Sequence, residues 1–307
     1  MQYIKVEYKQ SNQMYMEKLK LFVAIMAVSC VFVGCKVKSA QTLAENHVDL
    51  GTTDSIVTDS VKFENIDSAV SCRIKVDFPL GEGALADSVR AMISRQLSLV
   101  SLPMVMSLED STQTAYAGSL SDGQAMLSHY GEMTERQIRK DQQELEAFNG
   151  RVSFQYQYLA TLGKVADTER YLTYAVDAYC YLGGAHGSSL SYAVNVDKAT
   201  GETLRQVVDT TKTRELQPLL RAGVLRYLKD CGQEVKESEL ASMLFVKDGI
   251  IPLPARTPTL VDGGVRFDYQ QYEIGPYAMG IVSFTIPYAD IKPWLTEQAK
   301  QLAGVAE

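Results

Sequence analysis

Apolar and polar side chains alternate over several stretches of this 307-residue chain, which is the pattern of β-strands that bury one face. The longest alternation covers residues 152–162, where Val, Phe, Tyr, Tyr, Ala and Leu occupy every second position. Another runs from Val70 to Phe78. Further strands are predicted at Arg170–Leu182, Leu190–Val196, Thr259–Val261, Val265–Tyr269 and Ile281–Ile286, with a hairpin turn at Asp262-Gly263-Gly264.

In other stretches the apolar residues recur at helical spacing. The clearest example places five residues on one face: Leu85, Val89, Met92, Ile93 and Leu97. Residues 126–148 are helical in composition and strongly charged, and Asn149-Gly150 is a favourable C-terminal cap. A further helix is predicted over residues 216–228. A last short helix is predicted to place three residues on one face: Ile291, Trp294 and Leu295.

Strands in runs, with helices between the groups rather than after every strand, are typical of the α+β class. We therefore predict antiparallel sheets with packed helices. The order of the elements suggests a small strand–helix domain over residues 68–150, followed by a larger α+β domain over residues 151–307.

One apolar run fits neither a strand nor an amphipathic helix. Leu19–Gly34 is nearly all apolar, follows a lysine and ends in small residues, as a secretory signal peptide does. The 14 residues of Leu21–Gly34 are fewer than the ~20 that a membrane-spanning helix needs. A buried core helix or a short anchor is the alternative. Because Met16 begins a compact signal, we predict a signal peptide over residues 16–34 and expect residues 1–15 not to be translated.

Phe32-Val33-Gly34-Cys35 resembles the lipobox of bacterial lipoproteins, in which the cysteine becomes the first mature residue and carries lipid. Cys30 is a second candidate, but cleavage there would leave an apolar stretch at the new N-terminus. We predict lipidation at Cys35, including palmitate, and attachment to a membrane through this lipid. The expected location is the bacterial cell envelope, on its periplasmic or outer-membrane face.

Composition and charge limit the possible partners. The chain is 46% hydrophobic and 22% charged, which excludes a largely disordered protein. It carries 30 basic and 37 acidic side chains, a net charge of −7, so it lacks the basic excess that nucleic-acid binding requires. Removal of residues 1–34, which hold two more basic than acidic side chains, leaves 273 residues and a net charge of −9. Residues 35–67 are polar and are predicted to tether the domain to the membrane.

Cysteine and histidine are too sparse for the usual metal sites. Of five cysteines, Cys30 and Cys35 lie in the export segment, which leaves an odd number in the domain. Cys72 and Cys180 fall in predicted strands, and the pattern is equally compatible with two buried thiols or one disulfide. With no Cys-x-x-Cys motif and only three histidines, we predict no metal and no cofactor.

Two motifs stand out in the second half of the chain. The first is Tyr181–Gly187 (YLGGAHG), followed by Asn195–Asp197 and Thr200-Gly201. The second is Val265–Gly280, followed by Ile286–Tyr288. In this order they resemble the extracellular domain of RsiV-type anti-sigma factors, which also precedes the catalytic part of PdaC-type polysaccharide deacetylases. The resemblance covers roughly residues 152–295, and residues 70–100 are similar to the small domain that usually precedes it.

The resemblance implies an α+β domain outside the cytoplasm, in a family known largely as a domain of unknown function. In RsiV-type proteins this domain recognises lysozyme and so triggers release of a sigma factor. Here no sigma-binding segment or spanning helix precedes the domain, so we expect no direct anti-sigma role. No deacetylase catalytic domain follows it either.

His186 and Glu273 are the candidate catalytic residues. His186 occupies a glycine-flanked loop, where an imidazole can act as a general base near neutral pH. Alternatively, its glycines take positive φ and the histidine bonds the backbone to fix the turn. Glu273 could pair with His186 or accept backbone N–H bonds beside a proline. No Gly-x-Ser-x-Gly, His-Glu-x-x-His or Gly-x-x-x-x-Gly-Lys motif accompanies them.

Tyrosine is abundant, with 17 residues in the chain. Its apolar face and polar tip suit sugar stacking and protein interfaces, but alternation on strands also places tyrosines in the core. Seven crowd into the predicted β region: Tyr156, Tyr158, Tyr171, Tyr174, Tyr179, Tyr181 and Tyr192. Core packing and a binding face are both compatible with this pattern.

Together these features favour a non-catalytic binding module whose partner is a lysozyme-like protein or cell-wall glycan. The predicted binding residues lie in the two motifs: Gly183, Gly184, His186, Tyr272, Glu273 and Tyr277. An acidic exported domain would attract a cationic protein by electrostatic steering. The alternatives are a hydrolase or deacetylase-associated enzyme acting on envelope polysaccharide through His186 and Glu273, and a purely structural role.

Overall fold

The structure is a computed structural model that describes residues 55–101, 115–150 and 153–306. The chain divides into two compact units, Met1–Val37 and Lys38–Glu307, and all described residues belong to the second. The predicted signal peptide and the predicted lipidation site at Cys35 lie outside the described residues.

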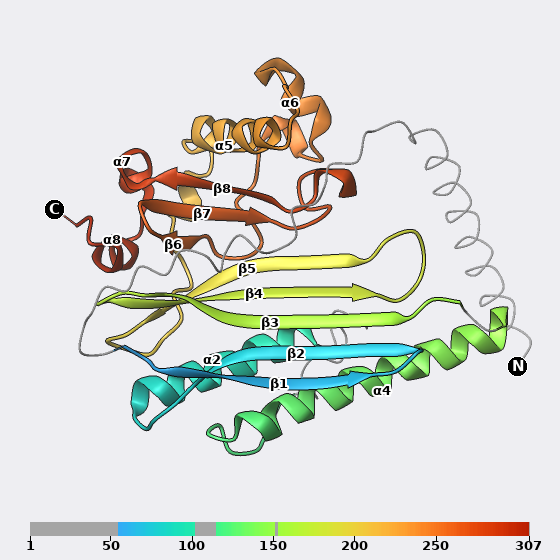
Figure 1. Ribbon diagram of the computed structural model, residues 1–307. Helices are drawn as coiled ribbons and strands as arrows, with labels where there is room; N and C mark the ends of the chain where they lie inside the picture. The colour runs from blue at the N-terminus through green and yellow to red at the C-terminus, as the bar shows by residue number, and fades with distance from the viewer. Residues whose placement is uncertain (1–54, 102–114, 151–152, 307) are drawn as a thin grey trace, which may run out of the picture. The chain divides into compact units, whose positions relative to one another are not determined.

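A five-stranded sheet forms the first half of the described chain, in the order β1-β2-β3-β4-β5 (Figure 1). All neighbours are antiparallel except β2 and β3, which pair in parallel. The strands are β1 (Thr58–Ile66), β2 (Val70–Pro79), β3 (Tyr156–Asp167), β4 (Tyr171–Tyr181) and β5 (Ser188–Asp197). Two helices between β2 and β3 pack on one face, α2 (Ala84–Val100) and α4 (Gly123–Asn149). The predicted α+β class with mostly antiparallel sheets is confirmed.

The alternating side chains of β3 explain why this sheet has one buried face. Tyr156, Tyr158, Ala160 and Leu162 are all buried against the helices. The apolar face predicted for residues 85–97 meets them from α2, where Val89, Met92, Ile93 and Leu97 are buried. Helix α4 ends where predicted, because Gly150 takes a φ of +78° and its N–H bonds the Glu146 carbonyl.

Strand β1 corrects one sequence-based expectation. Residues 58–66 were predicted as the end of the polar tether, but they form an edge strand paired with β2 along its whole length. In β1 only Val61 and Phe63 lean inward, and the outward side chains are polar except that of Ile66, so the apolar signal is weak. A Cβ on Gly131 would collide with the Phe63 ring, so this glycine lets α4 lie close to the strand.

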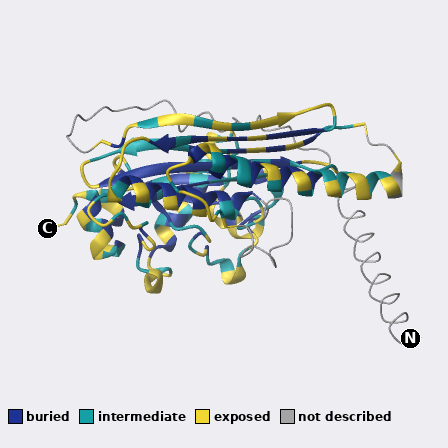
Figure 2. Cartoon of the chain, turned by 90° about the horizontal axis from the view of Figure 1, so that it is seen from below, coloured by how far each residue is buried: buried dark blue, intermediate teal, exposed yellow. Residues whose placement is uncertain are grey.

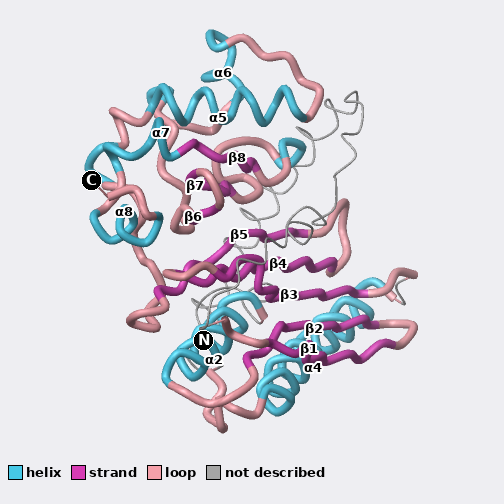
Figure 3. The backbone as a smooth tube through the Cα atoms, turned by 60° about the vertical axis from the view of Figure 1, so that its left-hand side comes forward, coloured by secondary structure: helices cyan, strands magenta, loops and turns pink. Residues whose placement is uncertain are grey.

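The second half of the chain forms a three-stranded antiparallel sheet in the order β6-β7-β8 (Figure 3). The strands are β6 (Thr259–Val261), β7 (Gly264–Tyr269) and β8 (Val282–Pro287). The helices are α5 (Gln217–Asp230), α6 (Glu237–Met243), α7 (Tyr288–Ile291) and α8 (Glu297–Ala303). The predicted hairpin is confirmed, with Gly263 at a φ of +74° in its turn. Helix α5 packs on β8, where a Cβ on Gly223 would overlap the Phe284 ring.

The C-terminal prediction is wrong in detail. Ile291, Trp294 and Leu295 do not share one helix, because α7 ends at Ile291 and residues 292–294 form a 3-10 turn. Leu295 is extended, and Thr296 then caps the separate helix α8 by accepting a hydrogen bond from the Ala299 N–H. Proline at position 293 prevents a continuous α-helix through this stretch.

Two clusters of buried apolar side chains hold the fold together, and in Figure 2 the buried positions follow the strands. The first cluster lies between the five-stranded sheet and its helices and draws on residues 56–196. The second contains Tyr171 and residues from 204 to 302. The five-stranded sheet therefore continues across residue 151, where the sequence places a domain boundary, and the two cores divide between positions 196 and 204.

A buried asparagine joins the two sheets. Asn195 on β5 accepts a hydrogen bond from the Leu260 N–H at 2.7 Å and donates to the Leu260 carbonyl at 3.0 Å. The side-chain amide of Asn195 thus makes the same pair of hydrogen bonds with β6 that the backbone of a neighbouring strand would make. Thr259 adds a third link, since its hydroxyl donates to the Ala193 carbonyl at 3.1 Å.

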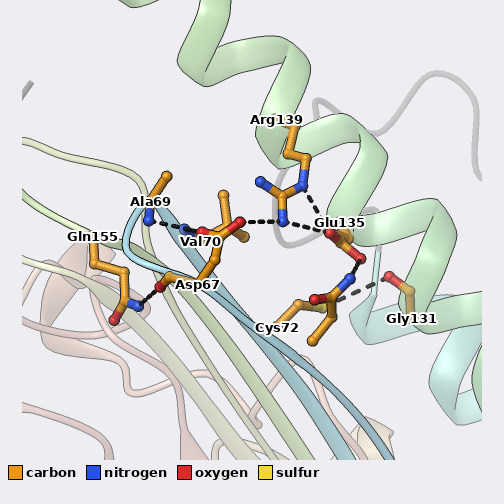
Figure 4. A network of polar contacts seen from close by, with 9 residues as sticks. Asp67, Ala69, Val70, Cys72, Gly131, Glu135, Arg139 and Gln155 are labelled. Carbon is orange, nitrogen blue, oxygen red and sulfur yellow. Dashed lines mark hydrogen bonds and ion pairs between the residues drawn. The ribbon is translucent and has the colours of Figure 1, made fainter. Parts of the chain in front are cut away.

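Cys72 and Cys180 are buried thiols and do not form a disulfide. Cys72 and Cys180 lie on β2 and β4 in one cross-strand row, with Tyr158 of β3 between them. Two strand spacings amount to ~9–10 Å, beyond the Cα separation of a disulfide. The Cys72 thiol instead donates to the Gly131 carbonyl of α4, next to the polar network in which Arg139 joins Asp67 and Glu135 (Figure 4).

Cys72 is expected to resist alkylation in the folded chain. Burial raises the pKa of its thiol to about 12, and the Glu135 carboxylate adds to the rise. At pH 8 its thiolate fraction is then about a thousandfold below that of an ordinary cysteine. Iodoacetamide at pH 8, followed by peptide mass spectrometry, should leave Cys72 unmodified in the native protein and modified after unfolding in urea. Equal labelling rates in the two states would contradict this assignment.

Within the described ranges, none of the helices combines the length and the apolar character needed to cross a membrane.

Candidate functional site

The first site loop joins β4 to β5 and contains the predicted Gly183, Gly184 and His186. Both glycines take positive φ, +94° and +93°, a backbone conformation that other residues adopt only with strain. Gly183 is also packed, since an added Cβ would lie 2.7 Å from the Phe154 ring. The Tyr181 hydroxyl donates to the Gly184 carbonyl at 3.1 Å and closes the turn. The loop therefore holds His186 in a defined, solvent-exposed position.

The second site loop, residues 270–277, follows β7 and docks on the edge of β5. The Gln270 amide accepts from the Ser191 N–H at 3.0 Å and donates to the Ser191 carbonyl at 2.8 Å. Gln271 accepts from the Ser189 N–H at 2.9 Å. These two side chains replace the strand that β5 lacks on this side, and they bring the second motif against the first.

At this junction the His186 and Tyr277 rings stack with their centroids 3.7 Å apart and an interplanar angle of 19°. The Tyr277 hydroxyl donates to the Gly187 carbonyl at 2.9 Å, and His186 Nδ1 lies 3.1 Å from the same oxygen. A carbonyl oxygen only accepts, so Nδ1 carries the hydrogen and Nε2 of the neutral ring is an acceptor. The Tyr272 hydroxyl lies 3.4 Å from that Nε2.

Tyr272 is exposed, with half of its surface accessible to solvent. Its φ is +67°, in the left-handed region that a tyrosine enters only at a cost in energy. The Tyr272 and Tyr277 centroids are 5.8 Å apart. We call His186, Tyr272 and Tyr277 together the aromatic surface. The strained backbone at Tyr272 presents its ring beside the other two.

The aromatic surface rests on Tyr179 of β4. A Cβ on Gly187 would overlap the Tyr179 ring, so the loop lies directly against it. Burial raises the pKa of Tyr179, and the neighbouring Tyr277 raises it further. The phenol under the surface therefore stays neutral at physiological pH.

Glu273 has a different role from the acid–base partner that the sequence allows. Its Oε1 accepts from the Ala255 N–H at 2.6 Å, and its Oε2 accepts from the Gln270 N–H at 2.7 Å. Both oxygens are thus engaged by backbone amides that fix the second loop. His186 instead contacts Gly187 and the two tyrosines. The geometry matches the backbone-bonded alternative for both residues.

Most of the tyrosines in the β region belong to the cores. Tyr158 donates to the Val100 carbonyl, Tyr174 to the Asp77 carbonyl and Tyr192 to Gln96, so their hydroxyls are satisfied inside the protein. Burial raises the pKa of each of these three phenols.

Sequence reasoning missed Phe245, whose side chain is 61% exposed. Its N–H donates to the Ile274 carbonyl at 2.8 Å, so a third loop reaches the second one. A single phenylalanine between two short helices carries no periodic signal.

The arrangement offers flat rings, the side-chain amides of Gln270 and Gln271, and the Nε2 atom of His186. Across the described ranges, the structure holds no cluster of three or more His, Cys, Asp or Glu side chains able to bind a metal ion. What the site can do chemically is stack against a ligand and hydrogen-bond its edge.

Comparisons with known proteins agree with this picture of the fold. Residues 218–289 match the model of a family described as "Protein of unknown function (DUF3298)". This range contains all of α5 except its first residue, the second sheet and the second site loop. A search of curated proteins found no match.

Two solved structures are similar over most of the chain. One is a member of the DUF3298 family from Bacteroides fragilis, with 18% identity, a TM-score of 0.58, and coverage of 82% of this chain and 98% of that one. The other is a DUF3298 family protein from Pseudomonas aeruginosa, with 15% identity, a TM-score of 0.54, and coverage of 80% and 97%. At these identities the likeness concerns the α+β fold.

Proposed function

We propose that this chain is a lipid-anchored protein of the bacterial cell envelope that binds cell-wall glycan, without catalysis, through the aromatic surface. The observation that carries the proposal is the stacked His186–Tyr277 pair with the half-exposed Tyr272 beside it. Sugar rings have apolar faces and polar edges, which aromatic rings with nearby hydrogen-bonding groups accommodate. The site loops also hold these rings in place before any ligand arrives.

The anchor and the location rest on the sequence. Leu19–Gly34 has the pattern of a signal peptide, and Cys35 follows it in a lipobox-like context. The resemblance of the two site loops to the extracellular domain of RsiV-type and PdaC-type proteins supports a place outside the cytoplasm. PdaC-type proteins act on polysaccharide, which favours a glycan as the ligand.

A binding role is favoured over an enzymatic one by the state of the two candidate catalytic residues. Glu273 is committed to two backbone amides, and His186 Nδ1 to a backbone carbonyl. A general acid or base must reach the substrate with a free position. Among the polar side-chain atoms of Glu273 and His186, only His186 Nε2 is not bonded to the backbone, and it lies beside the Tyr272 hydroxyl.

A cationic protein such as lysozyme is the second candidate partner. The net charge of −9 on the chain after residue 34 favours it, since opposite charge speeds association. Such binding would weaken steeply with salt, whereas ring stacking on a neutral sugar would not. Salt dependence therefore separates the two partners.

Replacing Tyr272 with asparagine is expected to weaken glycan binding about tenfold, because one exposed stacking ring is worth more than ~1 kcal/mol at a binding surface. Asparagine tolerates the left-handed backbone, so the loop conformation is retained. The measurement is calorimetric titration of the full-length chain with chitotetraose, plus co-sedimentation with insoluble peptidoglycan, in 50 and 300 mM salt.

The matched control is Leu80→Asn, which removes another half-exposed apolar side chain outside the two site loops. It should bind as the unchanged protein does. Glycan binding that survives Y272N would contradict the aromatic surface as the site. If the protein binds neither glycan but binds hen egg-white lysozyme in a salt-sensitive way, the partner is a cationic protein and not a glycan.

A further inference from the structure

A separate cavity of about 190 Å³ opens between α2, the middle of β5 and two loops. The loops are residues 203–205, after β5, and residues 256–258, before β6. Each of the three segments outside the sheet contributes an arginine to the lining: Arg95 from α2, Arg205 and Arg256 from the loops. Its lining, as far as the described residues define it, includes no aspartate, glutamate or lysine.

These three arginines differ from the arginines that form ion pairs elsewhere in the described residues. Arg90, Arg139 and Arg266 each form an ion pair with a carboxylate. In the part of the chain that the structure describes, neither an ion pair nor a side-chain hydrogen bond engages the three cavity arginines. Three like charges thus face one cavity in a chain whose net charge is −7. A bound anion would relieve their mutual repulsion and use their open donors.

The cavity is held in shape by contacts that do not depend on a ligand. The Arg256 guanidinium lies over the Tyr192 ring, 4.5 Å from its centroid. Tyr192 is buried and donates its hydroxyl to Gln96 at 2.7 Å, which fixes the floor. The Thr257 hydroxyl donates to the Arg205 carbonyl at 3.0 Å and ties the two loops together. Binding here would cost little ordering of the protein.

We propose that this cavity binds a phosphate monoester group. Guanidinium groups bind phosphate and carboxylate through paired N–H donors. Three guanidiniums from three segments suit the three terminal oxygens and the near −2 charge of a phosphate monoester better than the two oxygens of a carboxylate. The volume is below the ~300–1,000 Å³ of pockets that enclose drug-sized ligands, so the cavity takes the phosphate end of a molecule.

The site is independent of the proposed glycan binding, because none of the cavity residues belongs to the aromatic surface. A phosphate monoester can be carried by a soluble sugar or by a lipid headgroup. The shared chemistry is the phosphoryl group, and the experiment distinguishes its carriers.

The test is calorimetric titration of the full-length chain with glucose 6-phosphate and with short-chain dihexanoyl phosphatidic acid below its micellar concentration. Glucose and dihexanoyl phosphatidylcholine are the matched ligands without the monoester. Arg205→Gln and Arg95→Gln remove exposed cations and should fold normally. Arg256→Lys keeps the charge over Tyr192 but removes the paired donors. Arg214→Gln, an exposed arginine outside the cavity, is the control.

We expect binding of at least one phosphate monoester, no binding of its matched ligand, and a loss of at least tenfold in affinity for R205Q and R256K. The R214Q protein should stay within twofold of the unchanged chain. Tighter binding of glucose 6-phosphate identifies a soluble carrier, and tighter binding of phosphatidic acid identifies a lipid. Binding that survives R95Q, R205Q and R256K, or the absence of binding to both monoesters, would overturn the proposal.

Discussion

Replacing Asp167 with alanine is expected to lower the free energy of unfolding by about 3–5 kcal/mol, the usual cost of breaking a buried ion pair from one side. Asp167 Oδ1 lies 2.6 Å from Lys198 Nζ, and Oδ2 lies 2.9 Å from Lys164 Nζ. The Lys198 side chain is only 6% exposed. Without the carboxylate, Lys198 would keep a buried charge with no counter-ion among the described residues. Lys164 would keep its hydrogen bond to the Ile56 carbonyl.

Asp167 also holds the start of the described chain against the sheet. Its Oδ2 accepts from the Ser55 hydroxyl at 3.0 Å and from the Ile56 N–H at 3.1 Å. Lys198 lies in the turn after β5, so one carboxylate at the end of β3 joins three separate segments. Its loss should therefore expose the amides of β1 to hydrogen exchange before those of β4.

The pH dependence of this effect has a definite sign. Burial raises the pKa of Asp167, but the hydrogen bonds and charges of Lys198 and Lys164 outweigh it, and the net pKa is lowered. A carboxyl group with a lowered folded-state pKa stabilises the fold above its unfolded pKa of ~3.9, and this contribution disappears as the pH falls through the folded value. The stability difference between the variant and the unchanged chain should thus be full at pH 7 and shrink below pH 4.

Urea unfolding followed by circular dichroism at pH 7 and pH 3 measures both effects. Asp59→Ala is the matched control, because Asp59 is an exposed aspartate on β1 whose carboxylate bonds only the adjacent Ser60 N–H among the described residues. It should change stability by less than ~0.5 kcal/mol. A loss below ~1 kcal/mol for D167A at pH 7 would show that the three-way junction contributes little.

The clearest sequence patterns belong to elements that bury one face. Tyr156 to Leu162 and Val89 to Leu97 alternate or recur because a continuous core lies beside them. Strand β1 was missed since an edge strand needs only backbone pairing on one side, and its two inward residues make no periodic pattern. Helix α8 was not predicted, because the last predicted helix was placed at Ile291, Trp294 and Leu295, before α8 begins.

The pattern of apolar residues does not predict which strands pair with each other in a sheet. The parallel pairing of β2 with β3 requires a long crossover, which α2 and α4 supply together. Hydrophobic periodicity assigns an element and its buried face but does not select the neighbouring strand. The prediction of a boundary at residue 151 arose from this gap, since the sheet is completed across it.

Sequence analysis predicted which residues form the candidate site but not how their side chains contact one another. The two motifs containing His186 and Tyr277 were singled out, yet nothing in their spacing indicates that the rings stack. That contact depends on Gln270 and Gln271, which dock on the edge of β5 through side-chain amides. The arginine-lined cavity was not predicted at all, because exposed arginines at three distant positions are ordinary in any sequence.

Replacing Phe267 with alanine is expected to cost about 3–5 kcal/mol, the usual loss for a large buried aromatic side chain. Phe267 is fully buried in the central strand of the second sheet. Its ring stacks on that of Phe284, its direct partner on β8, with centroids 5.6 Å apart. Because α5 packs closely over Phe284 at Gly223, the surrounding elements have little freedom to fill the cavity left behind.

The measurement is thermal unfolding followed by circular dichroism, with hydrogen exchange on both sheets. For a folded unit of this size, the expected loss corresponds to a decrease of roughly 6–20 °C in Tm. Phe245→Ala is the matched control, since its ring is 61% exposed and its removal should cost less than ~0.5 kcal/mol.

Hydrogen exchange then tests whether the two cores unfold together. Asn195 bonds both backbone groups of Leu260 in a buried position, so we expect loss of the second core to destabilise the first. In the F267A protein, amides of β3 and β4 should exchange faster along with those of β7 and β8. Unchanged protection of β3 and β4, with rapid exchange in β7 and β8, would mean that the two cores are independent folding units joined by this one asparagine.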